Sequence, residues 1–352
     1  MDSVTQIALG AAVAGVVAGR QCTPKVLLAG AALGTLPDLD VLISYGDPVS
    51  DMVKHRGFSH SLFVLLPFSW LLATLWQRLR PTDFTFARLW LLVAASLITH
   101  PLLDSFTTYG TQLLWPITTP YAVSSIFIID PLYTVPLVVT LLASVLWRDR
   151  MAKLCGIGLT ISTLYLGWSW LALNMVENRV DAQLAGTTLA DKPRFFAPTP
   201  LNTVLWRVVV KDGDQYWEGL ASLLDKNSEI SFIAKDRGER PSQLASSHLS
   251  DLEAFTNGFV KYEQRNDQLV VTDLRLGMVD YLPFQFALAH KQAAQWQATD
   301  PVQLESPAVK PKHLPALWLR LLGNQDIDAN LCHVSECPTS EMNVQVSSGT
   351  RQ

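Results

Sequence analysis

Charged residues are distributed unevenly along this chain of 352 residues, and this limits the folds open to it. Residues 1–175 contain 19 Lys, Arg, Asp and Glu side chains, whereas residues 176–352 contain 39. Soluble domains are on average about 25% charged, and the first half is far below that share. The sequence therefore predicts a membrane-embedded domain over residues 1–175, a water-soluble domain over residues 176–340 and a disordered tail over residues 341–352.

Apolar runs subdivide the first half. Four of them approach the about 17–25 residues that a helix needs to cross a bilayer: 61–76, 89–103, 131–147 and 154–175. Two shorter runs, 5–19 and 26–36, are rich in Gly and Ala, which favours close packing between helices. We expect them to form a helical hairpin that turns at residues 20–25, where Pro24 interrupts the chain, with a re-entrant pair as the alternative. The predicted fold class is an α-helical polytopic membrane domain of about six segments, the first two short, followed by an α+β soluble domain.

Positively charged side chains indicate the orientation of these segments. They gather in three turns: Arg20 and Lys25 in the first, Arg78, Arg80 and Arg88 in the second, and Arg148, Arg150 and Lys153 in the third. The long connection 105–130 contains no Lys or Arg. Because basic loops face the cytoplasm, we expect the soluble domain and both termini on the outer side of the membrane. The start Met-Asp lacks a basic n-region, so we expect no cleaved signal peptide.

The second half alternates between β-branched runs and turn residues. The pattern predicts strands over 203–210, 229–234, 258–263, 268–273 and 284–289, and a helix over 241–257. We therefore expect an α+β domain dominated by an antiparallel sheet. Its four histidines do not have the spacing of a metal or catalytic site: His248, His290, His313 and His333.

Composition excludes two classes of protein. A net charge of -4 gives no support for a nucleic-acid-binding domain. Four cysteines are too few for a secreted disulfide scaffold of this length. Cys332 and Cys337 both fall in the predicted outer domain, where they could pair in an oxidising compartment. Two free thiols in a mobile tail are the alternative.

Three short segments place His and Asp side chains at the ends of predicted helices. They are residues 36–40 (LPDLD), 55–61 (HRGFSHS) and 100–104 (HPLLD). In the predicted orientation all of them lie at the outer ends of the helices. Ionisable residues at membrane depth are costly and usually mark a functional site. The candidate metal ligands are Asp38, Asp40, His55, His60, His100 and Asp104.

Spacing suggests how some of these side chains could converge. His100 and Asp104 are four residues apart, so they share one helix face. Asp38 and Asp40 follow a helix-ending proline, where an extended backbone would aim both carboxylates the same way.

The candidate histidines and aspartates also limit which metal ions the site can bind and how many. His55 and His60 bracket a glycine-containing turn that could direct both imidazoles inward. Imidazole and carboxylate ligands suit zinc, with manganese or iron as alternatives. Six ligands exceed what one four-coordinate ion needs, so the sequence favours two ions bridged by a carboxylate over a single ion.

Two further residues are candidates for catalysis. Arg56 lies between the two histidines and could clamp a phosphate or carboxylate oxygen, or anchor the chain at lipid headgroups. Asp130 directly precedes Pro131, so it is either a helix N-cap or a catalytic carboxylate.

The order of these motifs resembles that of a known family. The segments TLPDLD (35–40), HRGFSHS (55–61) and THPLLD (99–104), followed by TTYG (107–110), are similar to the YdjM-type family of bacterial inner-membrane, metal-dependent hydrolases, as is the opening MDSVTQIALGAAVAG. The resemblance covers about residues 1–175 and implies an inner-membrane location and metal ligands at the six positions above. Many relatives carry a histidine where this chain has Gln6. Either the site has one ligand fewer, or Gln6 binds water or substrate, or Asp2 compensates.

The predicted metal site leads first to the hypothesis of an enzyme. We expect a hydrolase in which metal-activated water attacks an ester or phosphoester of a lipid or lipid-linked substrate at the outer face, with Arg56 stabilising the developing oxyanion. One alternative is a non-catalytic envelope protein with a structural metal site and a soluble domain that binds a partner. The other is a metal or proton transporter. An open pocket with Arg56 beside the metals would favour catalysis, and a sealed four-ligand site would argue against it.

Overall fold

The computed structural model describes residues 1–292, 295–308 and 310–334, and it divides the chain into two compact units. The first unit comprises residues 1–44, 53–170 and 200–202, and the second comprises residues 45–52, 171–199 and 203–352. The predicted tail 341–352 and Cys337 lie outside the described residues. Cys332 is disulfide-bonded, whereas Cys22 and Cys155 are free thiols.

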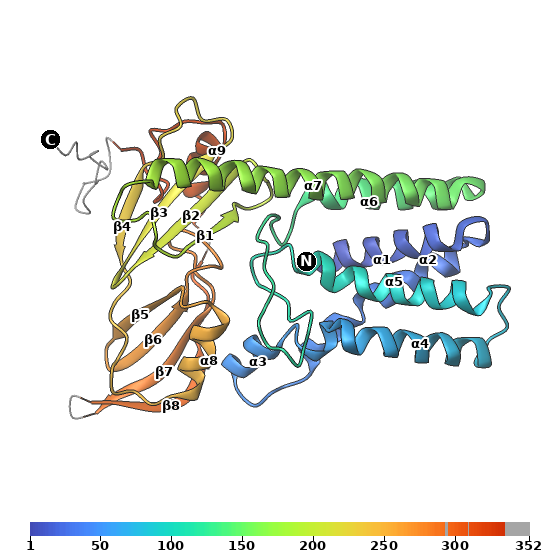
Figure 1. Ribbon diagram of the computed structural model, residues 1–352, viewed down its shortest axis with the longest axis horizontal. Coiled ribbons are helices and arrows are strands. Elements are labelled where there is room, and N and C mark those ends of the chain that lie inside the picture. Colours follow the sequence, from blue (N-terminus) through green and yellow to red (C-terminus); the bar gives the residue numbers. More distant parts are fainter. Residues whose placement is uncertain (293–294, 309, 335–352) are drawn as a thin grey trace. The chain divides into compact units, whose positions relative to one another are not determined.

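Six helices build the first unit, and the last of them continues into the second (Figure 1). They are α1 (Ser3–Ala18), α2 (Pro24–Thr35), α4 (Leu62–Leu79), α5 (Phe86–Asp104), α6 (Pro131–Leu146) and α7 (Met151–Leu184), with short 3-10 turns η1 (Gly19–Gln21) and η4 (Arg148–Arg150) at two connections. Four of the described helical segments are long and apolar enough to cross a membrane: Ser3–Gln21, Leu62–Leu79, Phe86–Asp104 and Arg148–Leu184. The helical membrane domain is confirmed. The first segment is longer than predicted, and α6 is a shorter apolar helix.

Glycines allow the first two helices to pack closely as the predicted hairpin. A Cβ atom on Gly10 would overlap the carbonyl oxygen of Gly30, and one on Gly34 would lie 2.6 Å from the carbonyl oxygen of Gln6. Thr23 caps α2 by accepting a hydrogen bond from the Val26 amide, and Pro24 occupies the first turn, where its missing N–H costs nothing. The hairpin therefore brings the backbone of α2 close to the start of α1.

The connections at the end opposite the turn between α1 and α2 are joined to one another by backbone hydrogen bonds. They contain η2 (Pro37–Leu42), α3 (Pro48–Lys54), η3 (Phe58–His60) and the long segment 105–130. The Gln112 amide donates to the carbonyl oxygen of Arg56 at 3.0 Å, and the Leu62 amide donates to that of Leu113 at 2.9 Å. The long connection thus holds the segment from Arg56 to Leu62 in place.

The second unit contains two four-stranded antiparallel sheets. One has the order β1 (Arg194–Pro198), β2 (Leu205–Asp212), β3 (Gln215–Ser222) and β4 (Phe232–Asp236); the other has the order β5 (Val260–Arg265), β6 (Gln268–Asp273), β7 (Gln285–Gln292) and β8 (Gln295–Gln303). Helices α8 (Ser247–Phe255) and α9 (His313–Leu321) complete it. The five predicted strands are confirmed, and α8 is a shorter form of the predicted helix. The strands β1, β3 and β8 were not predicted, since β8 is mostly exposed and β1 and β3 lack a clear polar alternation.

Candidate metal centre

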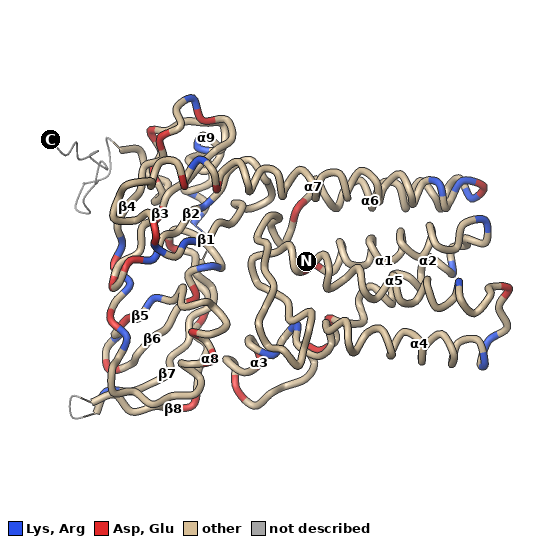
Figure 2. Tube along the Cα trace, in the orientation of Figure 1, with Lys and Arg blue, Asp and Glu red and all other residues tan. Residues whose placement is uncertain are grey.

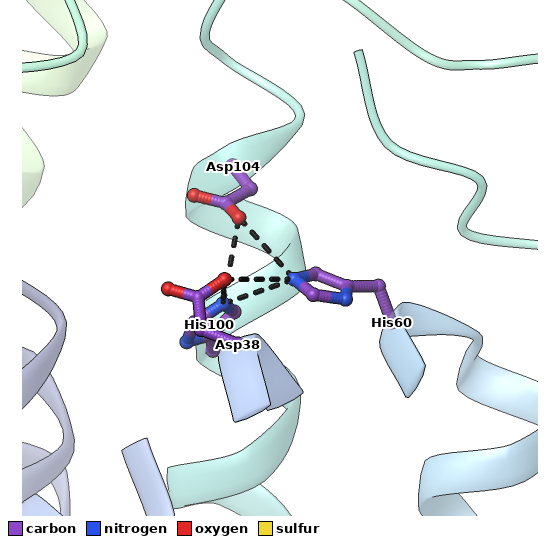
Figure 3. Close-up of side chains that lie close together, drawn as sticks. All are labelled: Asp38, His60, His100 and Asp104. Atoms are coloured by element: carbon purple, nitrogen blue, oxygen red, sulfur yellow. Dashed lines mark hydrogen bonds and ion pairs between the residues drawn. The ribbon is translucent and has the colours of Figure 1, made fainter. Parts of the chain in front are cut away.

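Four of the predicted ligands meet at one end of the helical unit (Figure 3). Asp38 comes from η2, His60 from the end of η3, and His100 and Asp104 from the last two turns of α5. One ligand atom of each lies within 4.8 Å of those of the other three. Both imidazoles and the Asp104 carboxylate are fully buried, whereas the Asp38 side chain keeps 28% of its surface exposed.

The spacing of the ligand atoms is that of a four-coordinate ion. His60 Nε2 and His100 Nε2 are 3.1 Å apart. Asp38 Oδ1 is 3.4 and 3.2 Å from these two nitrogens, and Asp104 Oδ2 is 3.5 and 3.4 Å from them. Ligands about 2.0–2.1 Å from a tetrahedral zinc ion are separated by about 3.3–3.4 Å. The side-chain positions therefore fit a tetrahedral nitrogen and oxygen site.

Hydrogen bonds behind His100 set its tautomer. Its Nδ1 atom lies 2.5 Å from the carbonyl oxygen of Gly34, which can only accept a hydrogen bond. Nδ1 therefore carries a proton, and when the ring is neutral Nε2 is the atom that can bind a metal ion. The close packing of the hairpin has a direct effect here, because it positions the Gly34 carbonyl.

The hydrogen bonds of Ser59 and Asp40 set the tautomer of His60. The Ser59 hydroxyl donates to Asp40 Oδ2 at 2.6 Å, so its oxygen is available to accept the Nδ1 proton of His60 at 2.9 Å. His60 Nε2 thus also presents a lone pair. Such partners behind a histidine are typical of metal sites, where they fix ring orientation.

Two imidazole nitrogens and two carboxylate oxygens therefore converge, and with both rings neutral each of these four atoms offers a lone pair. Asp104 Oδ2 is a buried atom that accepts no hydrogen bond from the described residues. Four electron-rich atoms at this spacing repel one another unless a cation lies between them. The donor set fits a divalent metal ion, and the ion pair of Asp104 Oδ2 with Arg56 Nε supplies part of the compensating charge.

Asp40 and His55 lie beside this centre but pair with each other. Asp40 accepts hydrogen bonds from His55 Nδ1 at 2.9 Å, from the Arg56 amide at 3.0 Å and from Ser59. Burial raises the pKa of Asp40, but its hydrogen bonds with His55 and the Ser59 hydroxyl lower it below its ordinary value. Asp40 is therefore an ionised carboxylate whose hydrogen bonds orient its neighbours.

The prediction that Asp38 and Asp40 point the same way is wrong. The backbone after Pro37 is not extended but forms the 3-10 helix η2. Successive side chains in such a helix are rotated by about 120°, so residues two apart point in different directions. Asp38 consequently reaches His60 and His100, while Asp40 reaches His55 and Ser59. A second ion at Asp40 and His55 stays a prediction.

Arg56 is buried against the centre. Its Nε atom lies 3.2 Å from Asp104 Oδ2, and its Nη1 atom donates to Thr107 Oγ1 at 3.1 Å. Its guanidinium lies over the Tyr109 ring, 5.0 Å from the centroid. The backbone φ of 61° is unusual for a residue with a Cβ atom and is typical of strained functional positions. Thr107 and Tyr109 belong to the TTYG segment, and their place beside Arg56 has no signal in the local sequence spacing.

The remaining candidate residues are Gln6, Asp2 and Asp130, and each has different hydrogen-bond partners. Gln6 Nε2 donates to Asp104 Oδ1 at 2.9 Å, so Gln6 joins the surroundings of the centre. The α-amino group of Met1 contacts the same carboxylate. Asp2 accepts hydrogen bonds from Val4 and Thr5 as the N-cap of α1. Asp130 caps α6 through the Leu132 amide and accepts a hydrogen bond from Tyr165, and its catalytic role stays a prediction.

A comparison with protein families identifies the fold that carries this centre. A family model described as YdjM inner membrane protein matches residues 1–176, which is half of the chain and includes all four converging residues. The chain belongs to the YdjM family. As a YdjM protein with several apolar helices, it is a multi-pass protein of the inner membrane.

Two curated relatives match parts of this chain. Inner membrane protein YbcI of Escherichia coli (strain K12) is 39% identical over 99 residues, 26% of this chain and 54% of YbcI. Uncharacterized protein YfhP of Bacillus subtilis (strain 168) is 28% identical over 123 residues, 33% of this chain and 37% of YfhP. The chain thus spans about half of the first relative and about a third of the second. No solved structure matches it.

Proposed function

We propose that this YdjM protein is a membrane-bound, metal-dependent hydrolase that acts on an ester or phosphoester of a lipid or lipid-linked substrate. The observation that carries the proposal is the convergence of four potential ligand atoms with one member, Asp38, still partly exposed. A divalent ion held there, zinc being the best match to the ligands, would supply Lewis acidity and lower the pKa of a water molecule toward neutrality. Manganese and iron are the alternatives.

His55 is the residue best placed to move a proton. Its Nδ1 atom donates to the ionised Asp40, which leaves Nε2 of the neutral ring as an acceptor. The ring keeps 26% of its surface exposed and lies 6.0 Å from that of His60, centroid to centroid. A histidine oriented by a carboxylate next to a reaction centre is the usual arrangement for general acid–base catalysis. We therefore propose that His55 exchanges protons at Nε2 instead of binding the metal.

Arg56 supplies positive charge on the buried side of the centre. Its contact with Asp104 offsets part of the negative charge that two aspartates bring together. Because the guanidinium is held by Thr107 and Tyr109, its position is fixed before any substrate arrives. We propose that this fixed charge stabilises the oxyanion that develops during hydrolysis.

The reaction is proposed to occur at the outer face of the inner membrane. Lys and Arg residues gather at the turns α1–α2, α4–α5 and α6–α7 (Figure 2), whereas the residues of the metal centre lie at the opposite ends of these helices. Positively charged loops are retained in the cytoplasm. This charge distribution supports an orientation in which the centre faces outward.

A structural metal site is the second candidate, and one observation favours it. Four protein ligands, three of them fully buried, are the complement that a closed structural zinc site uses. Such a site would tie α5 to η2 and η3 and would leave the second unit to bind an envelope partner.

Metal content and hydrolysis of the same purified protein distinguish the two candidates. We expect about one equivalent of metal in the wild type, little in His60→Ala, and wild-type content in His55→Ala. Catalysis predicts that the wild type hydrolyses phospholipid or lipid-linked phosphate and that both variants lose this activity. His290→Ala, at an exposed position of β7, is the control. A metal-loaded wild type that hydrolyses none of these substrates would support the structural site.

A further inference from the structure

An apolar cavity of about 270 Å³ lies next to the metal centre. It is enclosed by η2, η3 and the first half of α4, all within the helical unit. Ten residues line it, and eight of them are apolar, among them Leu39, Phe58 and Phe68. Ligand pockets are typically concave and mostly apolar with few polar groups, and this cavity has that character.

The two polar residues of the cavity connect it to the centre. They are Asp40 and Ser59. Ser59 Oγ is the atom that bonds Nδ1 of His60, and Asp40 is the carboxylate that orients His55. When the apolar part of a molecule occupies the cavity, the polar group attached to it therefore lies next to Asp40 and Ser59. These two residues separate it from the metal ligands by a single side chain.

The cavity opens on a surface that faces lipid. Leu39 is 52% exposed, Phe58 38% and Phe68 37%. Further along α4 the exposed side chains are again large and apolar: Phe63, Leu66, Trp70, Leu71 and Leu75. Since α4 is one of the candidate membrane spans and only 17% of it is buried in the protein, these side chains face the bilayer. The mouth of the cavity is continuous with this surface.

We propose that the cavity binds one acyl chain of a glycerophospholipid and presents the headgroup side of that lipid to the metal centre. The hydrocarbon walls exclude a polar occupant, and the lipid around α4 supplies acyl chains at the highest local concentration. The proposal rests on the proposed hydrolase function for its substrate class, but acyl-chain binding can be measured without hydrolysis.

The test is photolabelling of the full-length protein in lipid nanodiscs of phosphatidylethanolamine and phosphatidylglycerol. A fraction of the phosphatidylglycerol carries a diazirine on one acyl chain, and labelled peptides are identified by mass spectrometry. We expect labels on the cavity segments of η2 and α4 in the wild type and their loss in Val64→Trp, which fills the cavity. Leu66→Trp adds the same side chain to the same helix at a position that does not line the cavity, and it should keep the labels.

Two results would overturn the proposal. Equal labelling of these segments in Val64→Trp and Leu66→Trp would show only lipid surrounding the helix. Labelling by a diazirine-bearing prenyl phosphate, but not by the phospholipid, would assign the cavity to a lipid-linked carrier. Ile43→Trp fills the opposite wall and replaces Val64→Trp should that variant lose its metal through misfolding. Cavity labelling in a protein without hydrolytic activity would refute the proposed function while leaving the acyl-chain site intact.

Discussion

The Nε2 atoms of His60 and His100 face each other across 3.1 Å, and the Nδ1 atom of each ring has a hydrogen-bond partner outside the centre. Each ring donates its other N–H group away from the centre, His60 to Ser59 and His100 to Gly34. Two lone pairs held so close are unfavourable unless a cation binds both. The hydrogen bonds behind the ligands are therefore as informative about the centre as the ligands themselves, and they lead to the predictions below.

Removal of the Ser59 hydroxyl should weaken metal binding while leaving all four ligands in place. Ser59→Ala deprives His60 Nδ1 of its acceptor and Asp40 of one donor. Loss of such a partner typically lowers metal affinity about 10–100-fold. Competition with a chromophoric zinc chelator measures the effect. Ser59→Thr, which keeps the hydroxyl, should stay near the wild type; equal loss in both variants would contradict a role for the hydroxyl.

A methyl group on Gly34 should separate the α1–α2 hairpin. In Gly34→Ala the new Cβ atom would meet the Gln6 carbonyl oxygen at 2.6 Å, and such overpacking costs about 1–3 kcal/mol. Thermal unfolding of the detergent-solubilised protein should show this loss, together with lower metal content because the Gly34 carbonyl holds His100. Gly167→Ala on α7 is the matched control, since a Cβ atom added there would meet no atom within 4 Å. Equal melting temperatures for the two variants would count against the packing argument.

The buried Glu218 should make the stability of the second unit depend on pH. Burial raises the pKa of Glu218, but Arg207 and Lys235 lower it more, so its pKa in the folded protein lies below the ordinary value. Its stabilising contribution is therefore complete above the unfolded pKa of about 4.3 and is lost as the pH falls toward the folded pKa. Glu218→Gln should lower the free energy of unfolding by about 3–5 kcal/mol at pH 7, because Arg207 stays buried without its partner.

Chemical denaturation of the full chain between pH 7 and pH 3 checks the Glu218 prediction. The acid-induced loss of stability should be smaller in Glu218→Gln than in the wild type, because the variant has no carboxylate to protonate there. Glu239→Gln, at an exposed position of the same unit, should follow the wild type. A Glu218→Gln curve parallel to that of the wild type would show that this ion pair does not govern the acid response.

The proposed orientation predicts which loops a membrane-impermeant maleimide can reach in intact spheroplasts. Ile117→Cys introduces a thiol in the connection 105–130, where Ile117 is 56% exposed, and it should be labelled from outside. Asp83→Cys lies in the basic turn between α4 and α5 and should be labelled only after the membrane is opened. The wild-type chain gives the background from its own cysteines. The reverse pattern would place the metal centre on the cytoplasmic face.

Patterns in the amino-acid sequence are enough to predict the helical membrane half, the β-rich half and the residue types of the centre. Long apolar runs can only be satisfied as helices in lipid, and the four-residue spacing of His100 and Asp104 places them on one face of α5 in any helix. Only the tertiary structure decided which other residues join them. Asp38 and Asp40 are two positions apart, and the 3-10 turn of η2 sends one to the centre and the other to His55. Likewise, the Gly34 carbonyl reaches His100 through contacts between two helices, although the two residues are 66 positions apart in the chain. Local spacing fixes directions within one element, whereas convergence depends on how separate elements pack.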